Sequence, residues 1–366
     1  MNPLPLSSPS PPAINLALQG GGSHGAFTWG VLDALLDDGR ISFEGISGTS
    51  AGAMNAVALA HGFAQAEDDG RDPREAARAS LASFWEGIVS LGALTEAHRE
   101  PYDLLFGGPG SDYSIVAIFA NAVSSFWSNI LSPYQSNPFD INPLRSFLKR
   151  QIDFEALARP RDLKVFVVAT RVTTGKAEVF TGSRLSADAV MASACLPTLF
   201  KAVEIEGDHF WDGGYSGNPA IHPLIYNCTG RDIVLVQINP IKRARLPTTT
   251  TQISDRVNEV TFNASLIGEM RAIEFVNRLL ADGKLDPSHY KPVFLHRIDG
   301  GAVLEAFAAS TKSSTHIKLI QTLRDLGRAQ ARTWLGQHFS DLGVNCSVDI
   351  KQDYLDDVRA SAIRQR

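Results

Sequence analysis

Cysteine is scarce in this sequence of 366 residues, in which it occurs as Cys195, Cys228 and Cys346. The three cysteines are odd in number, lie far apart and follow no metal-ligand spacing. This pattern excludes a disulfide framework and a cysteine-based zinc site, and it indicates ordinary thiols in a reducing compartment. We therefore expect no metal and no other cofactor, and the simplest location for such a chain is the cytoplasm.

Charge is sparse as well, because charged residues make up 20% of the chain and the formal net charge is −5. The sequence has no dense cluster of lysine and arginine, which excludes a nucleic-acid partner held through its phosphates. Hydrophobic residues reach 44%, which is too many for a disordered chain and enough for a large core. The length allows two domains or one large α/β domain.

A long apolar run is also missing. The longest uncharged stretch, residues 113–139, is interrupted by polar residues that share one helical stripe: Asn121, Ser124, Ser125, Ser128, Asn129 and Ser132. Residues 115–131 are therefore predicted to form an amphipathic helix rather than a membrane span. Two roles stay open for this helix, which are packing against the main domain and covering an active site as a lid or acyl-chain platform.

A strand, a glycine-rich loop and a helix follow one another twice near the start of the chain. Residues 14–18 predict a strand and residues 26–36 a helix, and the same order recurs at 41–46 and 53–66. Repeated units of this kind pack as a parallel sheet with helices on its faces. We expect an α/β fold, a three-layer α/β/α sandwich with a central, mostly parallel sheet.

Further elements extend this pattern along the chain. The region 67–160 is mainly helical in pattern, with a break expected at Pro101, and strands are predicted at 163–170, 177–180, 203–206, 209–211, 233–238 and 293–298. Two long amphipathic helices are predicted at 253–281 and 314–339. We expect a disordered tail at 1–12, which is rich in proline and serine and unlike a signal peptide, a catalytic domain at 13–240, and a mainly helical C-terminal extension at 241–366 packed on the same domain.

The Gly48–Gly52 segment reads Gly-Thr-Ser-Ala-Gly, a G-x-S-x-G motif placed where a predicted strand turns into a helix. The flanking glycines permit the tight turn that lifts a serine hydroxyl above the sheet. The helix that follows places its positive end near a developing oxyanion. Ser50 is therefore the candidate nucleophile, and a βα turn without chemistry is the alternative.

The Gly20–Gly25 segment reads Gly-Gly-Gly-Ser-His-Gly between the first strand and its helix. Three consecutive glycines present a row of backbone N–H groups that can form an oxyanion hole. The same segment satisfies G-x-G-x-x-G, with Glu44 about 20 residues on, where a ribose-binding acid is expected, so a dinucleotide-binding protein is an alternative. A purely structural turn is the third interpretation.

Asp212 opens an Asp-Gly-Gly segment after the predicted hairpin. A carboxylate within hydrogen-bond reach of Ser50 could act as its general base, although Asp-Gly most often marks a turn. One of the nine histidines could instead complete a triad. His209 and Asp212 point to opposite faces of a strand, however, and His222, His296 and His316 lie in no catalytic pattern.

These three motifs, in this order, resemble those of the patatin-like phospholipases, and the similarity extends over residues 14–238. The resemblance implies acyl-ester hydrolysis by a Ser-Asp dyad without a catalytic histidine or metal. It assigns Ser50 as the nucleophile and Asp212 as its base. The oxyanion hole would be formed by the backbone around Gly20, Gly21 and Gly22, and the motifs would be shaped by Gly25, Gly48, Gly52, Gly213 and Gly214.

One residue departs from the family pattern. The family usually carries arginine or lysine just before the last glycine of the loop, where this chain has His24, a weaker anchor for an anion. We expect a lipid acyl hydrolase, with neutral acyl esters, lysolipids and thioesters left open as substrates beside phospholipids. An inactive lipid-binding relative is a further alternative. A lipid substrate would also bring peripheral contact with a membrane, and nothing in the sequence indicates the oligomeric state.

Overall fold

The computed structural model describes residues 11–106, 133–136, 142–243, 245–305, 307, 311–312 and 314–355. Its centre is an eight-stranded sheet in the order β5-β6-β3-β2-β1-β7-β8, in which β4 also pairs with β3. The strands are β1 (Ala13–Leu18), β2 (Ser42–Thr49), β3 (Lys164–Arg171), β4 (Ala177–Phe180), β5 (Val203–Ile205), β6 (Asp208–Asp212), β7 (Asp232–Gln237) and β8 (Phe294–Asp299). From β3 to β8 all neighbours are parallel, whereas β4, β5 and β6 pair in antiparallel fashion.

Helices connect and cover these strands. They are α1 (Gly25–Asp38), α2 (Ala51–Asp69), α3 (Pro73–Phe106), α5 (Pro133–Ser136), α6 (Pro143–Gln151), α7 (Phe154–Ala158), α8 (Ala187–Ser193), α9 (His222–Asn227), α10 (Thr250–Ala281), α11 (Gly301–Glu305) and α12 (Ile317–His338). None of the described helices is long and apolar enough to cross a lipid bilayer.

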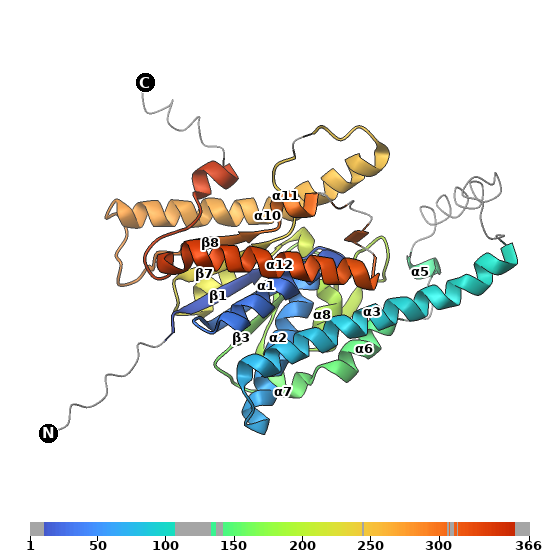
Figure 1. Ribbon diagram of the computed structural model, residues 1–366. Coiled ribbons are helices and arrows are strands. Elements are labelled where there is room, and N and C mark those ends of the chain that lie inside the picture. The colour runs from blue at the N-terminus through green and yellow to red at the C-terminus, as the bar shows by residue number, and fades with distance from the viewer. Residues whose placement is uncertain are drawn as a thin grey trace.

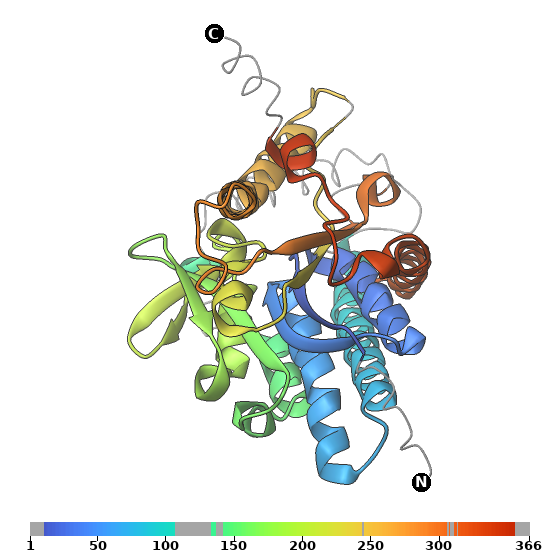
Figure 2. The same cartoon turned by 90° about the vertical axis from the view of Figure 1, so that its left-hand side faces the viewer.

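The strand side chains alternate between two hydrophobic cores, one on each face of the sheet. In β7, Val234 and Val236 belong to the core beneath α1, α2, α3 and α12, whereas Ile233 and Leu235 belong to the core beneath α9 and α10. In both views α12 lies beside α1, and the strands separate this pair from α10 (Figure 1, Figure 2). The predicted three-layer α/β/α fold with a mostly parallel sheet is confirmed.

The strand β3 brings two distant parts of the chain together along one of its edges. The pairing of β2 with β3 ends at Thr49, which lies opposite Val168. From the next β3 residue onward the partner is β6, with Asp212 opposite Ala169. Because β4 pairs with the same β3 residues as both of these strands, β4 must occupy the other edge. The end of β2 and the end of β6 therefore meet on one edge of β3.

Three features differ from the sequence expectations or lie beyond the description. The helix α3 continues past Pro101, where a break was expected; a proline removes one backbone hydrogen bond and does not by itself end a long helix. The strand predicted at 293–298 is β8, and because it forms the edge of the sheet beside β7, the sheet extends beyond residue 240. Most of the 113–139 stretch, including the predicted amphipathic helix at 115–131, lies outside the described residues, as do residues 1–10 of the predicted tail.

The contact between α1 and α12 depends on two glycines. A Cβ atom on Gly327 would overlap the carbonyl oxygen of Phe27, and one on Gly30 would overlap the carbonyl oxygen of Arg324. The two helix backbones therefore approach more closely than any side chain would permit, which fastens the C-terminal helix to the first helix of the domain.

We predict that Gly327→Ala destabilises the protein by about 1–3 kcal/mol, because the overlap outweighs the better helix propensity of alanine. Gly336→Ala is the matched control, since Gly336 lies on the same helix with open space around it and should raise stability by up to about 1 kcal/mol. Urea unfolding of both variants measures the difference. Equal effects of the two substitutions would contradict the close approach.

Candidate active site

Ser50 occupies a strained turn between β2 and α2. Its φ of 55° is rare for a residue with a side chain, and its backbone N–H donates to Ser193 Oγ at 2.9 Å. Glycine is required on both sides, because a Cβ on Gly48 would overlap the backbone of Gly52, and one on Gly52 would overlap the carbonyl oxygen of Leu18. The strain thus persists because close packing and a buried serine hold the turn.

Asp212 ends β6 and is 1% exposed. Its Oδ1 accepts the backbone N–H of Gly214 at 2.7 Å, and the Ser50 side chain lies close enough to the same carboxyl group to lower its pKa. Burial outweighs the opposing effects of Gly214 and Ser50 and raises the pKa of Asp212 to about 7. A carboxyl with such a pKa can take and return a proton near neutral pH, which is what a general base must do.

The backbone around Asp212 is fixed by neighbours on three elements. The Asp212 N–H donates to the carbonyl of Cys195 at 2.7 Å, and Thr170 Oγ1 donates to the Asp212 carbonyl at 2.8 Å. The loop that follows is fastened to β2, because Thr49 Oγ1 donates to the carbonyl of Gly217 at 2.6 Å. The carboxyl group is therefore held in place by its strand and by its loop.

The glycine loop lies beside Ser50, and its three glycines differ in their surroundings. Gly20 donates its N–H to Asn218 Oδ1 at 2.7 Å and accepts at its carbonyl from Asn239 Nδ2 at 2.6 Å. Gly21 and Gly22 line the cavity in front of Ser50, and within the described part of the chain their amides have no hydrogen-bond acceptor. Donors for an oxyanion are thus present at Gly21 and Gly22, whereas the Gly20 amide is engaged elsewhere.

The loop conformation itself requires glycine. Gly22 has a φ of 60°, in the left-handed region, and a Cβ there would overlap the carbonyl oxygen of Lys312. A Cβ on Gly20 would lie 2.7 Å from the Cβ of Ser50. The run of glycines therefore allows the backbone to approach the serine and the C-terminal region at the same time.

Ser50 and Asp212 line a cavity of about 720 Å³, within the usual range for small-molecule sites. One part of its wall is apolar and consists of Ala51, Met54, Phe84, Trp85, Ile88, Leu144, Ala194, Leu196 and Phe200. Other lining residues are polar, namely Asn239, Ser254, Asp255, Asn258, Glu259, Lys312 and Thr315, and the aromatic rings of Tyr215 and Phe262 also line the cavity. The cavity is therefore amphipathic, with the candidate dyad in its wall.

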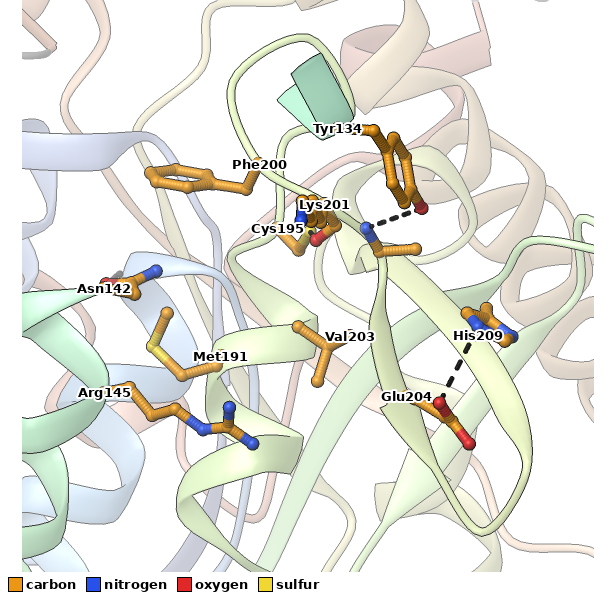
Figure 3. A pocket seen from close by; sticks show the side chains of 11 residues that line it. Tyr134, Asn142, Arg145, Met191, Cys195, Phe200, Lys201, Val203, Glu204 and His209 are labelled. Carbon is orange, nitrogen blue, oxygen red and sulfur yellow. Dashed lines mark hydrogen bonds and ion pairs between the residues drawn. The ribbon is translucent and has the colours of Figure 1, made fainter. Parts of the chain in front are cut away.

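A second, smaller cavity of about 310 Å³ shares Phe200 with the first (Figure 3). Neither Ser50 nor Asp212 lines it. In Figure 3, Tyr134 reaches the backbone of Ala202, and His209 faces Glu204 at 4.0 Å, so His209 does not serve Asp212. This smaller cavity adjoins the candidate site without containing its reactive groups.

Other sequence candidates are engaged far from the dyad. Glu44 accepts from the amides of Thr229 and Gly230, near the start of β2, so it is not the free acid that a ribose would need at the glycine loop. His222 bonds Glu269, and His296 bonds Asp232 and Ser347. Among the described residues, no histidine lines the cavity of Ser50, and no group of three or more His, Cys, Asp and Glu is placed to hold a metal ion.

His24 is 2% exposed and bonds Thr311 Oγ1 at 2.8 Å. Burial, together with the charge of Lys312, lowers the pKa of His24 to about 4, so this side chain is neutral at physiological pH. The chain therefore has no cation at the loop position where an arginine or lysine is usual. A cation beside the loop comes instead from Lys312, whose backbone packs on Gly22.

Sequence reasoning missed four residues that shape the site: Ser193, Asn218, Asn239 and Lys312. The sequence could have indicated Asn218, because this residue follows the Asp-Gly-Gly motif by a few positions, in a segment that has to return to β2. The other three lie in ordinary sequence surroundings, and only the fold brings them to the glycine loop and the serine turn.

Comparison with known proteins identifies a family, and several solved structures are similar to the chain. The profile of the family described as patatin-like phospholipase matches residues 16–225, more than half of the chain. No curated protein sequence matches. The crystal structure of VipD from Legionella pneumophila is similar at 16% identity, over 98% of this chain and 75% of that chain, with a TM-score of 0.40.

We predict that Asp212→Asn stabilises the protein at alkaline pH. The carboxyl has a pKa of about 7 when folded and about 3.8 when exposed, so its ionisation favours the unfolded chain. Stability is unaffected below pH ~4, falls as the pH rises toward 7, and stays reduced above it. Thermal unfolding should give the variant a higher Tm than the wild type at pH 8.5 and a smaller difference at pH 5. A wild-type Tm above that of the variant at pH 8.5 would contradict the assignment.

Proposed function

The chain belongs to the patatin-like phospholipase family, a family of lipid acyl hydrolases, and we propose that it cleaves acyl esters with Ser50 as nucleophile and Asp212 as general base. The observation that carries this proposal is that the Ser50 side chain adjoins the buried Asp212 carboxyl in the wall of a partly apolar cavity. A nucleophile and a base that adjoin each other need no third residue to pass a proton between them.

Acylation begins when the Ser50 hydroxyl transfers its proton to the Asp212 carboxylate and Oγ attacks the ester carbonyl carbon. The carbonyl oxygen becomes an oxyanion, which we assign to the free amides of Gly21 and Gly22. The Gly20 amide is bonded to Asn218, so we assign Gly20 to holding the loop rather than to the hole. Asp212 then returns the proton to the departing alcohol, and the acyl group remains on Ser50.

Deacylation repeats these steps with water. Asp212 takes a proton from the water, whose oxygen attacks the acyl carbon through a second tetrahedral oxyanion. Collapse of this intermediate breaks the bond to Ser50 Oγ, Asp212 gives the proton back to the serine, and the carboxylic acid leaves. Burial supports both halves of the cycle, because it gives Asp212 a pKa close to that of a base that works at neutral pH.

The two kinds of cavity wall fit the two ends of a lipid ester. The apolar residues Phe84, Trp85 and Ile88 suit an acyl chain, and the polar residues that α10 contributes, Ser254, Asp255 and Asn258, suit the alcohol portion. A substrate placed in this way has its ester carbonyl next to Ser50 and to the glycine loop, which line the same cavity. We therefore assign the acyl chain to the apolar wall.

We predict that Ser50→Ala and Asp212→Asn each lower the hydrolysis of short-chain acyl esters at least about a thousandfold, since the nucleophile or its base is lost. A fluorophosphonate probe should label the wild type and leave Ser50→Ala unlabelled. Near-UV circular dichroism checks that both variants are folded. Wild-type rates in either folded variant would remove the dyad from the mechanism.

The pH dependence of kcat/KM tests Asp212 separately. Only the ionised carboxylate accepts a proton, so the rate should fall about tenfold per pH unit below an apparent pKa near 7 and level off above it. The measurement is fatty-acid release from an uncharged ester between pH 5 and 9. A profile that is flat over this range would show that the base titrates below it, as an exposed carboxylate does.

A further inference from the structure

Phe200 lines both of the cavities described above, the one of about 720 Å³ that contains Ser50 and the smaller one of about 310 Å³. In Figure 3 its ring lies on the opposite side of the smaller cavity from His209. Phe200 is 38% exposed and belongs to neither hydrophobic core, so its ring is not needed to fill the interior. Phe200 therefore lies at the boundary between the two cavities.

The boundary between the cavities is one residue thick in two further segments. On α6, Leu144 lines the larger cavity and its neighbour Arg145 lines the smaller one. After α8, Ala194 and Leu196 line the larger cavity, and Cys195 between them lines the smaller one. The two cavities are therefore neighbours along both segments, and Phe200 completes the partition.

The partition belongs to the part of the larger cavity that suits an acyl chain. The residues that the larger cavity contributes to it are all apolar: Leu144, Ala194, Leu196 and Phe200. None of the residues that α10 contributes to the larger cavity lines the smaller one. The smaller cavity has the buried side chains of Met191 and Cys195, and its polar residues Glu204 and His209 are exposed. An apolar chain that crosses the partition therefore meets apolar surface again.

The backbone that carries Phe200 is fastened to the strand of Asp212. The N–H of Phe200 donates to the carbonyl of Leu196 at 3.0 Å, and Cys195 Sγ donates to the carbonyl of Lys201 at 3.0 Å. The carbonyl of Cys195 in turn accepts the N–H of Asp212 at 2.7 Å. The partition is therefore held at a fixed distance from the reacting atoms, as a residue that limits chain length has to be.

We propose that Phe200 limits the length of the acyl chain that the site accepts. The chain of a bound ester extends from Ser50 along the apolar lining to the Phe200 ring, which separates it from the smaller cavity. Carbon atoms beyond the ring gain no further burial in the wild type, whereas loss of the ring joins the cavities and admits them. This inference rests on the proposed function and adds its chain-length selectivity.

The test uses the full-length protein and the 4-nitrophenyl esters of octanoic and dodecanoic acid. Phe200→Ala should raise the preference in kcat/KM for the dodecanoyl ester over the octanoyl ester about tenfold, because about two more methylene groups leave water. Leu199→Ala is the matched control and should leave the ratio unchanged, since Leu199 is 62% exposed and lines neither cavity. An unchanged ratio in Phe200→Ala, or an equal rise in Leu199→Ala, would overturn the role of Phe200.

A second substitution tests where the longer chain goes. Ala202 lines the smaller cavity and not the larger one, so Ala202→Phe fills the smaller cavity from its own side. Added to Phe200→Ala, it should return the ratio to the wild-type value, and Ala202→Leu is the milder substitution if the phenylalanine prevents folding. A gain that survives both substitutions would place the extra room in the larger cavity and overturn the role of the smaller one.

Binding separates this inference from the proposed function. Calorimetric titration of Ser50→Ala with octanoate and dodecanoate gives an affinity ratio that does not depend on turnover. The ratio should favour dodecanoate about tenfold more in Ser50→Ala/Phe200→Ala than in Ser50→Ala, even if the wild type hydrolyses neither ester. Such a result without hydrolysis would remove the proposed function and keep the chain-length limit. Equal ratios in the two proteins, or no binding of dodecanoate to either, would overturn the limit.

Discussion

The edge of β3 at Val168 and Ala169 is the constraint on which the site depends. β2 ends there and β6 ends there from the opposite direction, so the residue after Thr49 and the last residue of β6 become neighbours. This junction brings Ser50 and Asp212 together although 162 residues separate them in the sequence. A slip of one residue in either strand would turn the reactive side chain to the other face of the sheet.

A network of buried amides supports this junction from behind. Gln19 accepts the N–H groups of Ile238 and Asn239 and donates to the carbonyl of Asn218. Asn218 and Asn239 then hold the two backbone groups of Gly20. Because unpaired buried polar groups are costly, this network favours one loop conformation, and it leaves the next two amides free. The same packing excludes water from Asp212 and sets its pKa.

The repeated strand-loop-helix pattern was enough to predict the three-layer fold. Each strand and helix of the repeat has its own spacing of hydrophobic residues, and each loop has its own turn residues. The three glycine-rich motifs indicated the candidate site residues Ser50, Asp212 and Gly20–Gly22, because tight turns leave a local signature in the sequence. The sequence does not reveal that the Gly20 amide is bonded to Asn218 or that Lys312 packs on Gly22, because these contacts depend on how the segment after β6 and the C-terminal region return to the loop. The sequence also does not reveal that α3 continues past Pro101. A proline normally predicts the end of a helix, but this long helix accommodates one.

The central claim is that Ser50 forms a covalent acyl intermediate under the control of Asp212. Acid quenching during turnover of a hexanoyl ester, followed by mass spectrometry of the digested protein, tests it most directly. The account predicts a hexanoyl group on the peptide that contains Ser50 and no such adduct in Asp212→Asn. Turnover without an adduct, or an adduct on another residue, would contradict it.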